Sequence, residues 1–413
     1  MEADQNKVGL WWHGKFRVAS TSVALVKYRK IIWMLQKYIN DRHSTRIAFF
    51  IAGLVTAIWA VIVPFAKMNT GINDAVLGTL LLCLGTGASL AMPTAGLLTS
   101  RYGCKKVIIA SVFIILITLP FLSLITHPIL LAIFLFGFGI GIGLLDCVVN
   151  IQAVMVEKKA KKALMSGFHG MFSVGGIAGA GLMTGFLNVG VNIVIATLMM
   201  MLLCIAFLVV CVPHLISDVS PTKGPAFAIP RGVVLIIGIV CFIVFMVEGS
   251  ALDWSAVYLV DSKHINDSLG GLGYVFFASS MTLGRLTGDY IIGKLGAMRV
   301  VIAGAIITVI GFYFVITGVE LYTLLVGYLL IGSGCANIVP VMYNQVGKQN
   351  TMPQAVAVPA ITTLGYLGIL AGPAGIGFVA HHSSLSHAFI FVAMLMVVVL
   401  IMAIALRNHL KAS

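Results

Sequence analysis

Apolar residues fill long stretches of this chain, and short polar or glycine-containing breaks separate them. A run of roughly 20 predominantly apolar residues is long enough to cross the hydrocarbon core of a bilayer as a helix. Twelve such runs can be read along the chain: 45–66, 75–99, 106–126, 128–156, 163–187, 190–213, 232–260, 269–293, 299–319, 321–347, 354–380 and 385–406. The pattern therefore predicts an all-α polytopic membrane protein with twelve transmembrane helices.

Glycines recur at one spacing in the two halves of the chain. Four pairs share a separation of 193 residues: Gly103 and Gly296, Gly139 and Gly332, Gly141 and Gly334, and Gly179 and Gly372. Repeated spacing of this kind is typical of a duplicated six-helix unit. We therefore expect two pseudo-symmetric bundles with the following divisions: a basic amino-terminal segment 1–44, bundles 45–213 and 232–406, a cytoplasmic linker 214–231 and a tail 407–413.

Composition and charge support the membrane interpretation. The 413 residues are 60% hydrophobic and 9% charged, with mean hydropathy +1.07, which excludes a soluble enzyme. All but three of the 26 Lys and Arg fall in segments on the side of the amino terminus; the exceptions are Lys67, Lys263 and Arg285. By the positive-inside rule this places both termini in the cytoplasm. The net charge of +13 thus reflects topology rather than nucleic-acid binding, and we expect a multi-pass, monomeric protein of a bacterial inner (plasma) membrane.

The first 44 residues mix basic and aromatic side chains and lack the pattern of a signal peptide. One interpretation is a helix lying on the anionic cytoplasmic leaflet. The other is that translation starts at Met34, which leaves only a short tail before the first span.

Other energy sources and cofactors find no support in the residues. The chain has no phosphate-binding loop with Gly-Lys-Ser/Thr, so ATP is not expected to drive it. Its seven cysteines have no metal-ligand spacing and are expected to pack as small core residues. We expect no cofactor, no metal and no enzymatic activity, which leaves an ion gradient as the energy source.

A glycine-basic turn follows the second predicted span. It contains Gly96, Arg101, Gly103, Lys105 and Lys106, and it has an echo at Lys294-Leu-Gly296-Ala-Met-Arg299. Together with twelve spans in two halves, this turn resembles the signature of the major facilitator superfamily. Ser100 stands where that signature has an acid. The resemblance implies that Gly96, Arg101, Gly103, Lys105 and Lys106 belong to a cytoplasmic gate, with a weakened charge relay.

Further motifs narrow the resemblance to the MosC/YbjJ-like branch. They are Glu248-Gly-Ser-x-x-Asp253-Trp254, the segment around Trp59, Asp146-x-x-x-Asn150 and His169-Gly170. The resemblance implies that spans 1, 4, 7 and 10 line a central cavity, and the association of this branch with an inositol derivative favours small polar solutes.

Two acids fall inside apolar spans, where an ionised carboxylate costs several kcal/mol without a partner, water or a proton. Glu248 follows the apolar run 232–247, and Asp146 lies in the fourth span. We expect Glu248 and Asp146 to couple proton movement to transport, with His169 as a possible relay. The alternative is that each is satisfied by hydrogen bonds and serves packing alone.

Neutral polar and aromatic residues supply candidate contacts for a solute. The expected substrate-binding set is Trp59, Asn150, Asp253, Trp254, Asn337, Tyr343, Asn344 and Tyr366, although core packing is the alternative for any one of them. Arg285 and Asp289, four residues apart in the eighth span, are expected to form an intrahelical ion pair that braces the gate.

The sequence therefore favours a secondary transporter of a small polar solute of sugar or polyol type, coupled to H⁺ and working by alternating access. Two alternatives remain: an efflux transporter for hydrophobic or chelating compounds, and a membrane sensor or scaffold that does not transport.

Overall fold

The computed structural model describes residues 13–72, 74–217, 229–266 and 269–412, and all regular structure within these ranges is helical. Ten segments of the described residues are long and apolar enough to cross a membrane. One of them, Thr79–Leu124, crosses twice because the chain reverses at Gly103, and the helix Leu272–Leu295 adds a further crossing. The expected twelve-span, all-helical fold is confirmed.

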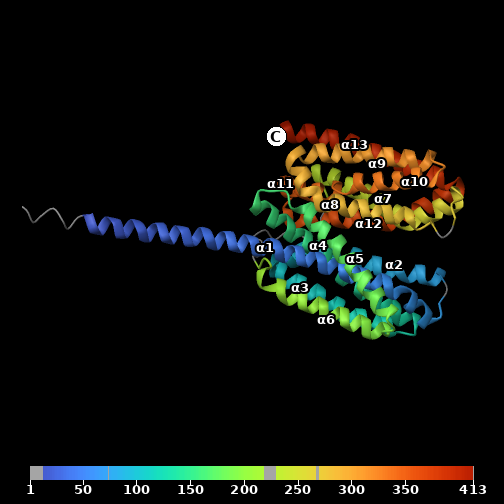
Figure 1. The fold of residues 1–413 in the computed structure, drawn as a ribbon, viewed down its shortest axis with the longest axis horizontal. Helices are drawn as coiled ribbons and strands as arrows, with labels where there is room; N and C mark the ends of the chain where they lie inside the picture. Colours follow the sequence, from blue (N-terminus) through green and yellow to red (C-terminus); the bar gives the residue numbers. More distant parts are fainter. Residues whose placement is uncertain (1–12, 73, 218–228, 267–268, 413) are drawn as a thin grey trace, which may run out of the picture.

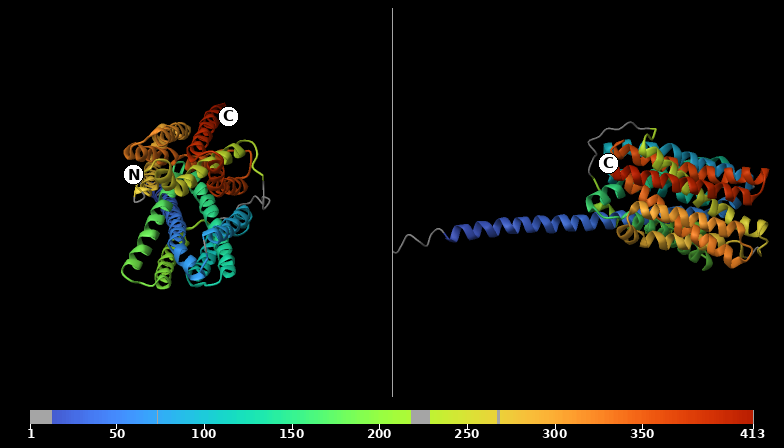
Figure 2. Two further views of the ribbon diagram at one scale, coloured as in Figure 1. Left: turned by 90° about the vertical axis from the view of Figure 1, so that its right-hand side faces the viewer. Right: turned by 90° about the horizontal axis from the view of Figure 1, so that it is seen from above.

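The two predicted halves lie side by side with their helices running along the long axis of the molecule (Figure 1), and they remain distinct when viewed along that axis (Figure 2). The first half contains α1 (His13–Thr70), α2 (Asp74–Ala91), η1 (Met92–Thr94), α3 (Ala95–Leu124), α4 (Pro128–Ala160), α5 (Met165–Asn188), α6 (Ile193–Cys211) and η2 (Val212–His214). The second half contains α7 (Val233–Val257), η3 (Tyr258–Ser262), α8 (Leu272–Leu295), α9 (Ala297–Thr317), α10 (Leu321–Cys335), α11 (Ile338–Lys348), α12 (Gln354–His382) and α13 (Leu385–Ala412).

Local sequence signals set several helix starts. Pro128 opens α4, where its missing N–H costs nothing, and His127 Nδ1 accepts a hydrogen bond from Ile129 N (3.3 Å). Asn192 caps α6 by accepting a hydrogen bond from Val194 N through its side chain (2.8 Å). These caps satisfy N–H groups that have no partner within their own helix.

Both halves turn at equivalent glycines. Gly103 has φ 80° and ψ 156°, and Gly296 has φ 85° and ψ 144°, a backbone conformation that side chains with a Cβ rarely adopt. The packing of α4 shows that the chain reverses at Gly103. Gly139 of α4 packs against Leu84, which precedes the turn, and Gly141 packs against Ile115, which follows it.

The same packing recurs in the second half at the spacing of 193 residues. A Cβ on Gly139 would lie 2.1 Å from Leu84 O, and a Cβ on Gly332 would lie 2.2 Å from Phe277 O. Both partners are also 193 residues apart. The glycines allow two backbones to touch in each half, which supports the duplicated unit inferred from the sequence.

The tenth span departs from the expected single helix, because it breaks at Ala336 and Asn337 between α10 and α11. Pro340 has no N–H to donate to the carbonyl group of Ala336, and its ring disfavours a regular helix at that point. Asn337 Nδ2 donates instead to Gly284 O of α8 (3.0 Å), which anchors the break.

The predicted boundary between segment 1–44 and the first span is absent from the described residues. α1 runs unbroken from His13 into the first span, and its first part projects from the bundle along the direction of the spans (Figure 1). Residues 13–44 therefore form no separate helix across the end of the bundle, and residues 1–12 lie outside the described part.

Candidate functional site

An ion pair lies near the middle of the membrane-spanning region. Glu248 Oε1 of α7 is 2.9 Å from Arg285 Nη2 of α8, and their side chains are 16% and 8% exposed. Glu248 is fifteen residues beyond Val233, about 22 Å along the helix at 1.5 Å per residue, in a span that ends at Ser262. The acid singled out by sequence is therefore buried with a cationic partner.

This pairing corrects the expected intrahelical pair of Arg285 with Asp289. Asp289 lies one turn nearer the linker end and accepts a hydrogen bond from Gly167 N through Oδ1 (3.1 Å). Arg285 turns toward Glu248 instead. The physical reason is that Glu248 lies deep in the bundle, where an isolated carboxylate is most costly, whereas Asp289 has a backbone donor and the nearby charge of Arg46.

Arg285 also reaches the other half of the protein. Its Nη1 donates to Ser173 Oγ of α5 over 3.4 Å, while Nε is buried without a hydrogen-bond partner. The Glu248–Arg285 pair is therefore in direct contact with the seam between the halves.

A second polar network spans the seam at the level of α4, α5, α11 and α12. His169 Nε2 and Asn150 Oδ1 are 3.1 Å apart, and Asn150 Nδ2 donates to Asp146 O (2.9 Å). In the second half, the hydroxyl groups of Tyr343 and Thr362 are 2.7 Å apart.

Two of the hydrogen bonds of this network, His169 with Asn150 and Tyr343 with Thr362, are related by the internal repeat. Tyr343 is 193 residues beyond Asn150, and Thr362 is 193 residues beyond His169. The rings of His169 and Tyr343 contact each other with centroids 5.7 Å apart. The hydrogen-bonded pair of the first half thus contacts the equivalent pair of the second half.

Asp146, the second predicted acid, does not contact Glu248. Its side chain is partly buried and makes no hydrogen bond or ion pair with any residue of the described ranges. It lies close enough to Tyr343 and Tyr366 to act on them electrostatically. Asp146 therefore offers an unused acceptor on the first half of the site.

The other predicted substrate contacts separate into different environments. Trp59 is buried against Phe138, with ring centroids 6.1 Å apart. Asp253 is exposed, one and a half turns beyond Glu248, and Trp254 packs beside Gly377. The structure brings neither Trp59 nor Trp254 against the central ion pair.

Asn337 and Asn344 make hydrogen bonds to groups other than the ion pair. Asn337 is buried between α8 and the break after α10, as described above. Asn344 Nδ2 donates to Glu157 Oε1 across the seam. Asn337 thus joins α8 to the break near the middle of the tenth span, and Asn344 joins α11 to α4 at the linker end.

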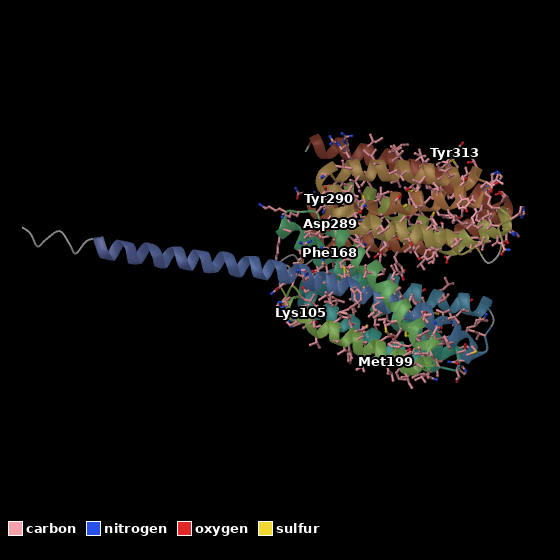
Figure 3. The ribbon with its side chains drawn as sticks, in the orientation of Figure 1. Lys105, Phe168, Met199, Asp289, Tyr290 and Tyr313 are labelled. Atoms are coloured by element: carbon pink, nitrogen blue, oxygen red, sulfur yellow. The ribbon has the colours of Figure 1, made fainter. Side chains whose placement is uncertain are left out.

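The closest contacts between the halves lie at the end that carries the linker. Figure 3 labels Asp289 and Phe168 in this region, where the two halves meet. A Cβ on Gly96 would lie 2.0 Å from Ala355 O, so the start of α3 packs directly on the start of α12. Gly96 and Asp289, both expected at the gate, therefore lie in the closed seam.

The basic turn has a different neighbour. Lys105 N donates to Ile216 O (3.0 Å), and Ser217 covers Gly103. Arg101 and Lys106 are exposed. The turn is thus tied to the first residues of the linker.

Glu157 is a site residue that sequence reasoning missed. It is 5% exposed, and its Oε2 accepts hydrogen bonds from Leu164 N (2.7 Å) and Met165 N (2.8 Å) at the start of α5. A lone acid at the end of an apolar span, a few residues before the next helix, was the available signal. Ser173 and Thr362 gave no comparable signal.

Comparison with known proteins places these features in one group. The sequence profile of the Major Facilitator Superfamily matches residues 45–358. An uncharacterised MFS-type transporter of Yersinia pestis is 47% identical over 366 residues, covering 88% of this chain and 95% of its own length. Membrane protein MosC of Rhizobium meliloti is 30% identical over 365 residues, covering 87% and 89%. The expected resemblance to this branch is confirmed.

Solved structures show the same fold at low identity. The fucose:proton symporter FucP of E. coli aligns with TM-score 0.75 and 14% identity, over 89% of this chain and 98% of its own. The human organic anion transporter MFSD10 aligns with TM-score 0.72 and 15% identity, over 89% and 99%.

Proposed function

Because this chain belongs to the major facilitator superfamily, we propose that it is a secondary active transporter that moves a small polar solute of sugar or polyol type together with a proton. It is a multi-pass membrane protein, and superfamily members bind small-molecule substrates. Rocking of the two halves about a midplane site would expose that site to each side in turn.

The ion pair between Glu248 and Arg285 is the observation that carries the proposal. A proton on Glu248 abolishes its attraction for Arg285, and Arg285 also contacts Ser173 in the opposite half. A change of protonation is therefore transmitted directly to the seam. Asp146 and His169 complete the proposed set as second acid and relay.

The closed linker end supports an assignment of the conformation. Charge distribution along the sequence puts the linker and both termini in the cytoplasm of the proposed inner-membrane protein. In this state the central site is then reached from outside, past the exposed side chains of Asp253 and Tyr274. Entry of solute and proton would precede opening of the contact between Gly96 and Ala355.

The decisive experiment measures proton binding by purified protein without substrate, comparing wild type with Glu248→Gln and Asp146→Asn. We expect wild type to take up a proton as the pH is lowered and Glu248→Gln to lose that uptake. Gly181→Ala is the matched control, because its added methyl group would meet no atom within 4 Å. If neither acid substitution alters proton binding, the carboxylate mechanism is wrong, and a facilitator or a sodium-coupled carrier takes its place.

A further inference from the structure

The guanidinium group of Arg285 has unused binding capacity. It has five N–H donors in a planar fork that matches a carboxylate group bidentately. Glu248 accepts from one of them at 2.9 Å, Ser173 accepts from another at 3.4 Å, and Nε is buried with no hydrogen-bond partner in the described part of the chain. Arg285 is only 7% exposed, so water satisfies little of the remainder.

Within the described ranges, Glu248 is the only ion-pair partner of Arg285. Four other titratable groups lie close enough to feel the charge of Glu248 or Arg285. They are Tyr274 on α8, Cys241 on α7, Cys335 on α10 and His169 on α5. None of these supplies a negative charge at neutral pH, because phenols and thiols titrate higher and imidazole is neutral or cationic.

The neighbouring acids Asp253 and Asp289 do not supply a counter-charge to Arg285 either. Asp253 of α7 is exposed, and Asp289 of α8 receives the hydrogen bond from Gly167 N. Protonation of Glu248 would therefore leave Arg285 as a buried cation without a counter-ion, which costs several kcal/mol. Glu248 can therefore take up a proton at low cost only if an anion binds to Arg285 at the same time.

The hydroxylated part of a ligand has a complementary partner. The carboxylate of Asp146 has no hydrogen bond to any described residue, and an ionised carboxylate can only accept hydrogen bonds. It belongs to α4 of the first half and lies close enough to Tyr343 and Tyr366 of the second half to act on them electrostatically. Hydroxyl groups can donate to Asp146, whereas a second carboxylate there would be repelled.

Resting on the proton coupling proposed above, we propose that the transported solute is a polyhydroxylated monocarboxylate, a sugar acid, whose carboxylate replaces Glu248 on Arg285 when Glu248 takes up the proton. The hydroxyl groups then face Asp146 and Tyr366. A neutral polyol offers no counter-charge to Arg285, and an amine complements only Asp146.

The test is isothermal titration calorimetry of the full-length protein in detergent with matched pairs of probes. The pairs are gluconate with glucitol and glucuronate with glucose, and glucosamine serves as the cationic probe. Titrations in buffers of different ionisation enthalpy count the protons bound with each ligand. We expect the carboxylates to bind with uptake of about one proton near neutral pH, and their affinity to fall about tenfold per pH unit once Glu248 is ionised.

Glu248→Gln isolates the exchange of counter-charge. It removes the competing carboxylate, so we expect it to bind gluconate without proton uptake and with affinity independent of pH. Gly181→Ala is expected to behave as wild type. The proton count on wild type keeps the test decisive even where the Glu248 variant fails to fold.

Four results would overturn the inference. Binding of glucitol and glucose as tight as their acids removes the role of the carboxylate, while proton uptake with those neutral ligands would leave the proposed coupling intact. Absence of binding by both acids, or a preference for glucosamine, also refutes the substrate class. Carboxylate binding without proton uptake by wild type contradicts the coupling itself.

Discussion

Gly96→Ala tests whether the contact between the start of α3 and the start of α12 closes the linker end. The added Cβ would lie 2.0 Å from Ala355 O and 3.2 Å from Pro359 Cγ. The first of these is a backbone atom, so two helices must move apart to admit the methyl group. Overpacking of this kind costs about 1–3 kcal/mol, and it acts only on the closed state.

The conformational effect follows from that difference. Alanine gains about 1 kcal/mol of helix propensity over glycine, but it gains this in the closed and open states alike. The closed state therefore loses about 1–3 kcal/mol relative to the open state, a shift of roughly 5- to 150-fold in the equilibrium between them.

Hydrogen–deuterium exchange in lipid nanodiscs measures the shift without added labels. We expect faster exchange in Gly96→Ala at the start of α12, from Gln354, and at the start of α5, from Met165. Gly181→Ala on α5 adds a methyl group where nothing lies within 4 Å and should exchange as wild type does. Equal exchange in Gly96→Ala and wild type at these two helix starts would refute the assignment of this contact as the closure.

Three further predictions concern the ion pair, the turns and the projecting helix. Arg285→Gln should lower the unfolding temperature of the purified protein strongly, since breaking a buried pair costs about 3–5 kcal/mol; combination with Glu248→Gln should recover most of that loss, and additive losses would argue against the pair. Gly103→Ala should destabilise more than Gly296→Ala, because both adopt positive φ with extended ψ at a cost of about 1–3 kcal/mol to other residues, but of the two only Gly103 is covered within 4 Å, by Ser217; equal unfolding temperatures would contradict this ranking. Deletion of residues 1–33 should leave solute flux in proteoliposomes unchanged, whereas loss of a bound partner with flux intact would favour a scaffold role.

Much of the fold could be predicted from the sequence because a bilayer permits few backbone structures. A span must satisfy its backbone polar groups internally, so long apolar runs such as 128–156 become helices. Gly103 and Gly296 marked both reversals because few other residues adopt their positive φ. The break at Ala336 escaped notice, although Pro340 carried its cause, because the apolar run continues across it.

The candidate site was only partly legible for a different reason. The cost of a charge in hydrocarbon identified Glu248 and Asp146 as residues that require explanation. It did not identify their partners, since an arginine four residues from an acid on one helix predicts a pair as readily as an arginine on the neighbouring helix. Arg285 was therefore assigned to Asp289, whereas the fold turns it toward Glu248.

Sequence by itself thus determined the number of spans, their duplication and the residues that are costly to bury, because each follows from local composition and backbone chemistry. Tertiary structure decided which side chains meet: Glu248 with Arg285, His169 with Tyr343, and Glu157 with the start of α5. These meetings depend on how helices far apart in the chain pack and rotate against one another. That geometry is set by close contacts such as Gly96 on Ala355, which no local pattern encodes.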